Sequence, residues 1–296
     1  TGCDGLIIDH CSFSFCDDQA LAVGSNYGVF ENVTMQKCIF SENATMVILG
    51  LNGTFDTGKI TFINNAFIDS RQRTPNIGGS TQYDVINNYY FNWVGRLTNI
   101  NGSASPDVNY IGNYLKEGTY TTADSANKHQ NGTPSIYTAN NYHNSLYPTP
   151  QLDDRNLWQD FSTGDPVSAS LFTTTEHSIL SGVVPDSALN VPDILDDIGA
   201  NKYLNLDGSF GSYSDSYDVT KIANAKANIS SDPDNKVWVL PTLPLNTRAA
   251  NYDTSGDGMP DAWKTANGLN PATDDSAFVW ESGYIGCEEY LNKIDS

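Results

Sequence analysis

The stretch Val85-Ile86-Asn87-Asn88-Tyr89-Tyr90 shows a pattern that recurs through the first half of the chain. Apolar and polar residues alternate, and the fourth residue is an Asn or a small residue. Five further segments share it, at 8–13, 35–40, 62–67, 110–115 and 138–143. Their fourth residues, with Asn88 included, are Cys11, Cys38, Asn65, Asn88, Asn113 and Asn141, at spacings of 27, 27, 23, 25 and 28 residues.

Short strands that return about every 25 residues, with no amphipathic helix between them, predict a solenoid. We therefore expect an all-β fold, a right-handed parallel β-helix whose coils lie about 4.8 Å apart. Equivalent side chains then stack, so the Asn residues would form a hydrogen-bonded ladder with Cys11 on Cys38 at its head. The alternative is a β-sandwich, which would need hairpin turns such as Asn-Gly at every second strand.

The repeat ends near residue 145, which predicts three regions. Residues 1–145 form the coils, and 146–245 form a loop-rich extension that packs on them and carries short helices near 190–199 and 218–228. Residues 246–296 form an acidic C-terminal segment with a last helix near 288–291. The net charge is −5 over residues 1–145 and −15 over residues 146–296.

Composition excludes several classes of function. The 296 residues carry a net charge of −20, and a nucleic-acid partner would need an excess of Lys and Arg. No apolar run approaches the roughly 20 residues of a membrane span. Of the five cysteines, at least one must stay unpaired within the chain.

The chain resembles the pectate lyase family of polysaccharide lyases. The residues that carry the resemblance are Ile7-Ile8-Asp9-His10-Cys11-Ser12-Phe13-Ser14, Asp17-Asp18-Gln19-Ala20-Leu21-Ala22-Val23, Arg71-Gln72-Arg73-Thr74-Pro75 and the segment 84–93. The segments 194–200 and 257–263 resemble the C-terminal extension of bacterial and fungal members.

The resemblance implies a secreted, extracellular enzyme that cleaves an acidic polysaccharide such as polygalacturonate by calcium-assisted β-elimination. In this family, Ca²⁺ held by acidic side chains spreads the charge that develops when the proton next to a carboxylate is removed. Arg73 matches the catalytic arginine, and Asp18 matches a calcium ligand whose role Asp17 could take instead. Arg71 and Trp93 are the candidate substrate-binding residues.

Three positions depart from the family pattern. Ala22 stands where a second calcium-binding acid is expected, Thr45 where a substrate-binding lysine is expected, and Asn76 where many members carry a second arginine. The coils that precede the Asp-His motif in the family are also missing. We therefore expect an exposed β-helix end that would accept an upstream segment or another copy. The alternative function is a non-catalytic β-helix subunit that binds carbohydrate or forms fibres.

A second calcium site is predicted near the C-terminus. Asp253, Ser255, Asp257 and Asp261 stand at positions 1, 3, 5 and 9 of a calcium-loop spacing, with Gly258 at the turn. Position 12 is Lys264, where a bidentate Glu is expected. The alternative is a metal-free acidic turn that caps the helix beginning at Pro260.

Secretion would make the chain a candidate glycoprotein. Its six Asn-X-Ser/Thr sequons are about as many as chance gives at this Asn, Ser and Thr content, so their number carries no weight. They begin at Asn32, Asn43, Asn52, Asn101, Asn131 and Asn228.

Overall fold

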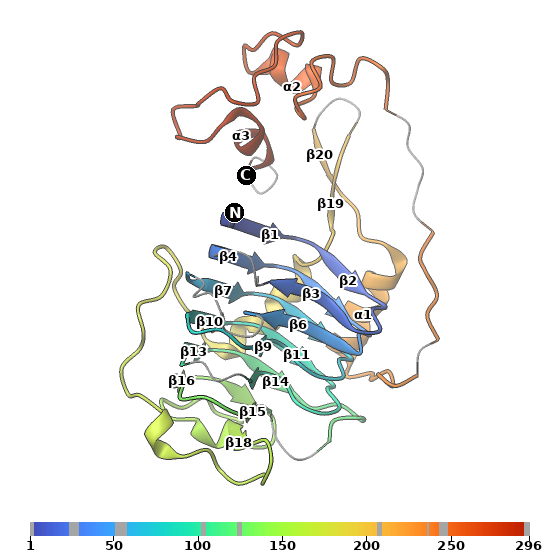
Figure 1. Ribbon diagram of the computed structural model, residues 1–296. Helices are drawn as coiled ribbons and strands as arrows, with labels where there is room; N and C mark the ends of the chain where they lie inside the picture. Colours follow the sequence, from blue (N-terminus) through green and yellow to red (C-terminus); the bar gives the residue numbers. More distant parts are fainter. Residues whose placement is uncertain are drawn as a thin grey trace. The chain divides into compact units, whose positions relative to one another are not determined.

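Three parallel sheets of six strands each form the body of the protein (Figure 1). The computed structural model describes residues 3–23, 30–50, 58–101, 105–122, 126–205, 209–235, 237–242 and 248–292. The chain divides into two compact units, Thr1–Ala200 with Ser216–Leu240, and Asn201–Asp215 with Pro241–Ser296, called here unit 1 and unit 2. The sheets belong to unit 1.

The strands follow one another from sheet to sheet along the chain. Sheet 1 contains β1 (Cys3–Asp9), β4 (Phe30–Gln36), β7 (Ile60–Ile63), β10 (Gln82–Ile86), β13 (Asp107–Ile111) and β16 (Ser135–Ala139). Sheet 2 contains β2 (Ser12–Ser14), β5 (Ile39–Ser41), β8 (Ala66–Ile68), β11 (Tyr89–Phe91), β14 (Tyr114–Lys116) and β17 (Tyr142–His143). Sheet 3 contains β3 (Gln19–Val23), β6 (Thr45–Leu49), β9 (Asn76–Ile77), β12 (Asn99–Ile100), β15 (Asn127–His129) and β18 (Trp158–Asp160).

This arrangement is the predicted right-handed parallel β-helix, and the β-sandwich alternative is wrong. Neighbouring strands within each of the three sheets pair in parallel, and equivalent residues of successive coils lie opposite one another. In the core, the rings of Phe13, Phe40, Phe67 and Tyr90 stack with centroids 4.7, 5.0 and 5.0 Å apart. In the interior, similar side chains of successive coils therefore stack on one another.

The predicted asparagine ladder is present between sheets 1 and 2. Asn88 Oδ1 accepts hydrogen bonds from the backbone N of Asn65 at 2.9 Å and from its Nδ2 at 3.0 Å. Asn113 does the same for Asn88, and Asn141 does it for Asn113. Each Nδ2 also donates to a backbone carbonyl, such as Met35 O for Asn65. All four amides are buried, so the ladder satisfies polar groups that water does not reach.

A carboxylate ends the ladder, which the repeat did not predict. Asp154 Oδ2 accepts from the backbone N of Asn141 at 2.9 Å and from its Nδ2 at 2.8 Å. Its other oxygen accepts from the Thr138 hydroxyl. Asp154 has no exposed surface, and burial raises its pKa to about 6 despite these hydrogen bonds.

Residues after the coils cover the outer face of sheet 2. The 3-10 helix η3 (Ala188–Asp196) and helix α1 (Ser216–Ala227) lie near the two helices expected here. η3 begins after Ser187, whose hydroxyl accepts from Leu189 N. A second apolar cluster joins the two segments to the sheet, and its buried members are Ile39, Ala66, Ile68, Tyr89, Phe91, Val191, Leu195, Ile198 and Ala225. Two further 3-10 turns lie on either side of β18: η1 (Arg155–Leu157) precedes it and η2 (Ala169–Leu171) follows it.

A buried lysine ties α1 to the coils. Lys221 Nζ lies 2.9 Å from Asp69 Oδ2 and 2.9 Å from Ser231 Oγ, and it also contacts Glu42 Oε1. Glu42 and Asp69 occupy equivalent positions of successive coils, with left-handed φ values of 48° and 52°. Asn92, on the next coil, donates to Asp69 Oδ1 at 2.6 Å. The ammonium therefore forms ion pairs with two stacked carboxylates.

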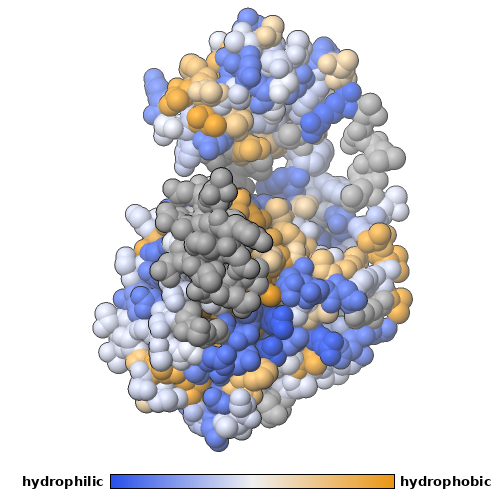
Figure 2. Space-filling model, in the orientation of Figure 1, coloured by the Kyte–Doolittle hydropathy of each residue, from blue (hydrophilic) through white to orange (hydrophobic). Residues whose placement is uncertain are grey.

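Unit 2 contains a short antiparallel pair, β19 (Lys202–Leu204) with β20 (Phe210–Ser212), and the helices α2 (Asp261–Ala266) and α3 (Gly286–Asn292). Its aromatic core includes Trp263, which contacts Trp280 and Tyr290 at centroid distances of 5.8 and 5.1 Å. In the described part of the chain, every helix falls short of the length and apolarity needed to cross a bilayer. Figure 2 shows hydrophilic and apolar residues interspersed over the visible face of each unit.

Removing the ladder's terminal charge should change how stability depends on pH. Because the pKa of Asp154 is raised to about 6 from 3.8, its proton stabilises the fold below pH 4, and this contribution is lost as pH rises through 6. The unfolding free energy of the wild type, relative to D154N, should fall by about 2–3 kcal/mol from pH 4 to pH 7 in urea titrations. The neighbouring D153N is the control: the Arg155 hydrogen bond lowers the pKa of Asp153, so its contribution changes mainly below pH 4 and the wild-type-to-D153N difference should stay nearly constant from pH 4 to pH 7. A wild-type-to-D154N difference that stays flat with pH would contradict the assignment.

Replacing the buried lysine should cost far more stability than replacing an exposed one. K221M leaves Asp69 buried without its counter-charge, and we expect a loss of about 3–5 kcal/mol in chemical denaturation. The matched control is K226M on the same helix, whose pair with Asp196 is exposed and should contribute less than about 1 kcal/mol. Equal losses in the two variants would show that Lys221 is not an anchor.

Candidate functional site

Charged and polar residues of four successive coils meet where the strands of sheet 3 begin. Asp18 directly precedes β3, Thr45 opens β6, and Arg73 and Arg96 each stand three residues before the next strands, β9 and β12. Backbone hydrogen bonds place these segments side by side, from Val47 N to Arg73 O at 2.9 Å and from Arg73 N to Arg96 O at 3.2 Å. We call Asp18, Thr45, Arg73 and Arg96 the polar row.

The backbone at Arg73 is held in an unusual conformation. Its φ of 64° lies in the left-handed region, which costs roughly 1–2 kcal/mol for a residue with a Cβ. Such conformations persist where the surrounding structure fixes them, and they cluster at functional sites. The side chain is partly exposed, but its Nε is buried without a hydrogen-bond partner among the described residues.

Arg96 brings a second guanidinium next to the first. Burial lowers its pKa, and the positive charge of Arg73 lowers it further. Its Cζ lies 4.9 Å from the centroid of the Phe161 ring, a cation–π contact. Its Nε also has no partner among the described residues. The pair is therefore a concentrated positive charge that suits an anionic ligand.

Asp18 lies at the other end of the row, roughly 10 Å from Arg73 by the spacing of two coils. Its Oδ1 accepts from Thr45 Oγ1 at 3.1 Å, and both Asp18 and Asp17 are exposed. Ala22, where the family pattern has a second acid, presents a methyl group to solvent. Within the described ranges, no group of three or more His, Cys, Asp or Glu side chains is arranged to hold a metal.

The two predicted substrate-binding residues lie in different environments. Arg71 is half-exposed near the polar row, and its Nε lies 3.2 Å from Asp234 Oδ1. Trp93 is 1% exposed and packs edge-on against His143 with centroids 5.8 Å apart. A ring enclosed in the core offers no face to a sugar, so the position of Trp93 supports packing instead of binding.

Sequence reasoning missed Arg96 and the neighbouring Lys128. Arg96 follows Arg73 by 23 residues, the same interval that separates Asn65 from Asn88, so the repeat spacing could have found it. Lys128 lies opposite Asn99 in the register of sheet 3, and its Nζ donates to Gln159 Oε1 at 3.0 Å. The repeat spacing gives no corresponding signal for Lys128.

His10 is partly buried between two carboxylates. Its Nδ1 lies 2.9 Å from Asp9 Oδ1, and its Nε2 lies 3.5 Å from Asp197 Oδ1. Burial alone would lower its pKa, but the Asp9 hydrogen bond and charge outweigh this and raise it.

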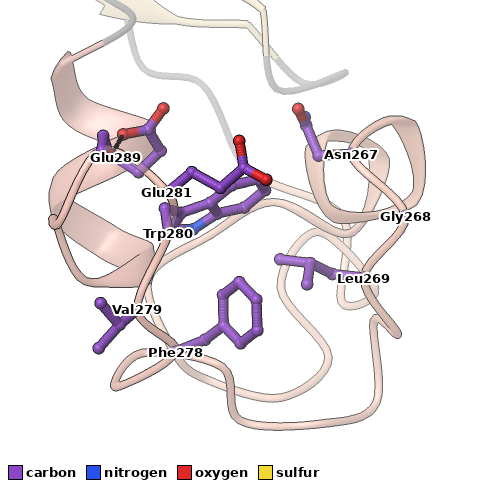
Figure 3. Close-up of a pocket in the computed structure, with 9 residues that line it drawn as sticks. Asn267, Gly268, Leu269, Phe278, Val279, Trp280, Glu281 and Glu289 are labelled. Atoms are coloured by element: carbon purple, nitrogen blue, oxygen red, sulfur yellow. Dashed lines mark hydrogen bonds between the residues drawn. The ribbon is translucent and has the colours of Figure 1, made fainter.

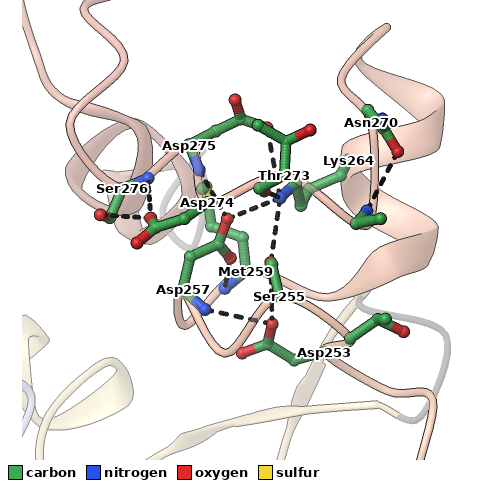
Figure 4. A network of polar contacts seen from close by, with 12 residues as sticks. Asp253, Ser255, Asp257, Met259, Lys264, Asn270, Thr273, Asp274, Asp275 and Ser276 are labelled. Atoms are coloured by element: carbon green, nitrogen blue, oxygen red, sulfur yellow. Dashed lines mark hydrogen bonds and ion pairs between the residues drawn. The ribbon is translucent and has the colours of Figure 1, made fainter.

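Unit 2 holds the residues of the predicted calcium loop and a separate pocket. Asp253, Ser255 and Asp257 lie in one loop, with Lys264 beside them (Figure 4). Asp261 is the first residue of α2.

The pocket, of about 520 Å³, is lined by apolar side chains such as Phe278 and Leu269 and by the carboxylates of Glu281 and Glu289 (Figure 3). Its lining residues include no Lys or Arg, so it does not suit an anionic polymer.

The sequon asparagines differ in exposure. Asn43 is buried, and its Oδ1 accepts from Cys16 N at 2.7 Å while its Nδ2 donates to Phe13 O at 2.9 Å. Asn52 lies outside the described residues. Those with exposed or partly exposed positions are Asn32, Asn101, Asn131 and Asn228.

Comparison with known proteins finds pectate lyases among the relatives of this chain. The chain is 26% identical over 294 residues to a probable pectate lyase C of Aspergillus flavus and 27% identical over 301 residues to one of Aspergillus fumigatus. Each alignment covers 98% of this chain and 65% of the relative. The chain is a pectate lyase-like parallel β-helix. No protein-family model matches it.

The likeness to pectate lyases extends beyond fungi. A probable pectate lyase 18 of Arabidopsis thaliana is 27% identical over 144 residues, which is 47% of this chain and 33% of the plant protein. The chain spans about 65% of the length of the fungal relatives, whose similarity reaches across both units.

Proposed function

We propose that this protein is a polysaccharide lyase that cleaves an acidic polysaccharide by β-elimination at the polar row. The observation that carries the proposal is the adjacent pair Arg73 and Arg96 on neighbouring coils, with both Nε atoms lacking partners among the described residues. The named relatives support the same class of reaction.

The pair suits this chemistry in two ways. A guanidinium binds a carboxylate through charge-assisted hydrogen bonds, which holds a uronate in place on a protein of net charge −20. β-Elimination also needs a base that takes the proton next to the carboxylate. We assign this role to Arg73, which matches the catalytic arginine of the pectate lyase pattern and is held in a left-handed backbone conformation. We assign Arg96 as its positive neighbour and carboxylate ligand.

We further propose that calcium assists the reaction. The described residues offer carboxylates at Asp18 and Asp17 but not the six to eight oxygens that Ca²⁺ takes. They do not make a complete site by themselves. A calcium ion here would take its remaining ligands from the carboxylates of the polymer and from water. We propose secretion on the same grounds, since such polymers lie outside the cell.

Non-catalytic carbohydrate binding is the second candidate. Ala22 and Thr45 favour it, because the family pattern has an acid and a lysine at these two positions. Assays for binding and for product separate the two functions, since a binding subunit would retain polygalacturonate without releasing unsaturated ends.

Arg73 is the residue whose replacement should test catalysis. With the full-length protein and polygalacturonate, R73K should lower the rate of ultraviolet-absorbing product formation at least about 100-fold, the usual effect of losing a general base. R155K is the control, because Arg155 pairs with Asp153 at an exposed position of η1. An R73K rate within a few-fold of wild type would show that Arg73 is not the base.

Calcium dependence can be measured with the same assay. If Asp18 and the polymer share an ion, product formation should stop in excess EDTA and return when calcium is restored. D18N should raise the calcium concentration needed for half-maximal rate about tenfold, since one charged ligand is lost. Undiminished activity in EDTA would contradict calcium assistance. The role of Arg73 is tested separately, by R73K.

A further inference from the structure

The C-terminal loop has the spacing of a calcium loop but a lysine at its last ligand position. Asp253, Ser255 and Asp257 stand at positions 1, 3 and 5, and Gly258 follows with a φ of 86°, in the region that favours glycine. Lys264 stands at position 12, where a glutamate would give two oxygens to the ion. The chain thus has a positive charge where calcium would need a negative one.

The ammonium of Lys264 lies among the groups that would otherwise hold a cation (Figure 4). Its Nζ is 2.6 Å from Asp257 Oδ2, 3.2 Å from Asp275 Oδ2 and 3.1 Å from Ser255 Oγ, and it also donates to the Thr273 carbonyl. The Lys264 side chain is 0% exposed. Acceptors therefore surround the ammonium, and two carboxylates share its charge.

The remaining acids of the loop are used by its own backbone and side chains. Asp253 accepts from the backbone N of Gly256 at 2.8 Å and of Gly258 at 2.9 Å. Asp261 accepts from Thr254 N at 2.8 Å and from the Thr254 hydroxyl at 2.5 Å. These bonds give the loop its shape without an ion.

A calcium ion does not fit this arrangement. It would need six to eight oxygens at 2.3–2.6 Å, and positions 3 and 5 already point at an ammonium that would repel it. No cluster of metal-binding side chains is found within the described ranges either. We propose that Lys264 is a built-in cation that takes the place of calcium, so that unit 2 folds and stays folded without metal.

Hydrogen exchange measured by mass spectrometry tests this in the whole protein, peptide by peptide. In the wild type, peptides covering 253–275 should exchange equally fast in calcium and in EDTA. In K264E, which restores the acid at position 12, the same peptides should exchange quickly in EDTA and about tenfold more slowly when calcium is tenfold above its Kd. K264M, which has neither charge, should lose wild-type protection in EDTA because Asp257 is left buried without its counter-charge, although it keeps its backbone hydrogen bonds.

None of these exchange measurements depends on lyase activity. Peptides covering β13 of unit 1 should be unchanged in all three proteins. Calcium protection of 253–275 in the wild type would overturn the proposal, as would wild-type protection of K264M in EDTA. If the exchange rate of the K264E peptides does not change with calcium, the proposal is also contradicted, because the lysine would then not be what excludes the ion.

Discussion

In unit 1, a residue on one coil lies next to the equivalent residue of the neighbouring coil. The side chain at each position must therefore pack well against another side chain of the same kind. Parallel pairing in register places equivalent residues opposite one another, about 4.8 Å apart. An asparagine amide meets this demand because it both donates and accepts, and a phenylalanine ring meets it by stacking face to face. A carboxylate accepts but does not donate, so Asp154 ends the asparagine ladder and cannot continue it.

Charged side chains do not pack well in this way, because like charges repel. The two charged stacks of the protein differ in the partners that they have. The acidic stack of Glu42 and Asp69 forms ion pairs with Lys221 of α1. The basic stack of Arg73 and Arg96 receives a ring, Phe161, but its Nε atoms have no partner among the described residues. One stack is completed within the chain and holds the extension in place. The other keeps its capacity for an external anion, which is why we locate function there.

The sequence predicts the coils well because the constraint that builds them is local and periodic. Asn65, Asn88, Asn113 and Asn141 stand at nearly regular intervals, so their ladder can be inferred from the spacing alone. The ladder's end and the lysine anchor could not be inferred. Asp154 and Lys221 reach their partners through loops and helices of irregular length.

The candidate site was predicted in part, for the same reason. Arg73 carries a recognisable motif, and Arg96 could have been found from the 23-residue interval. Trp93 lies next to the motif residues in sequence, but its side chain turns into the core. Alternation along a strand decides which face a residue occupies, and Trp93 follows the strand end, where that rule no longer applies.

The internal ammonium of Lys264 bears on the environment in which such a protein would work. A polyuronate is itself a chelator, and its carboxylates compete for every free divalent ion nearby. A module held together by a dissociable ion would be at risk of losing it to the polymer that we propose as the substrate. A cation joined to the backbone through a side chain cannot be extracted in this way, so unit 2 would keep its structure however strongly the surrounding polysaccharide depletes calcium.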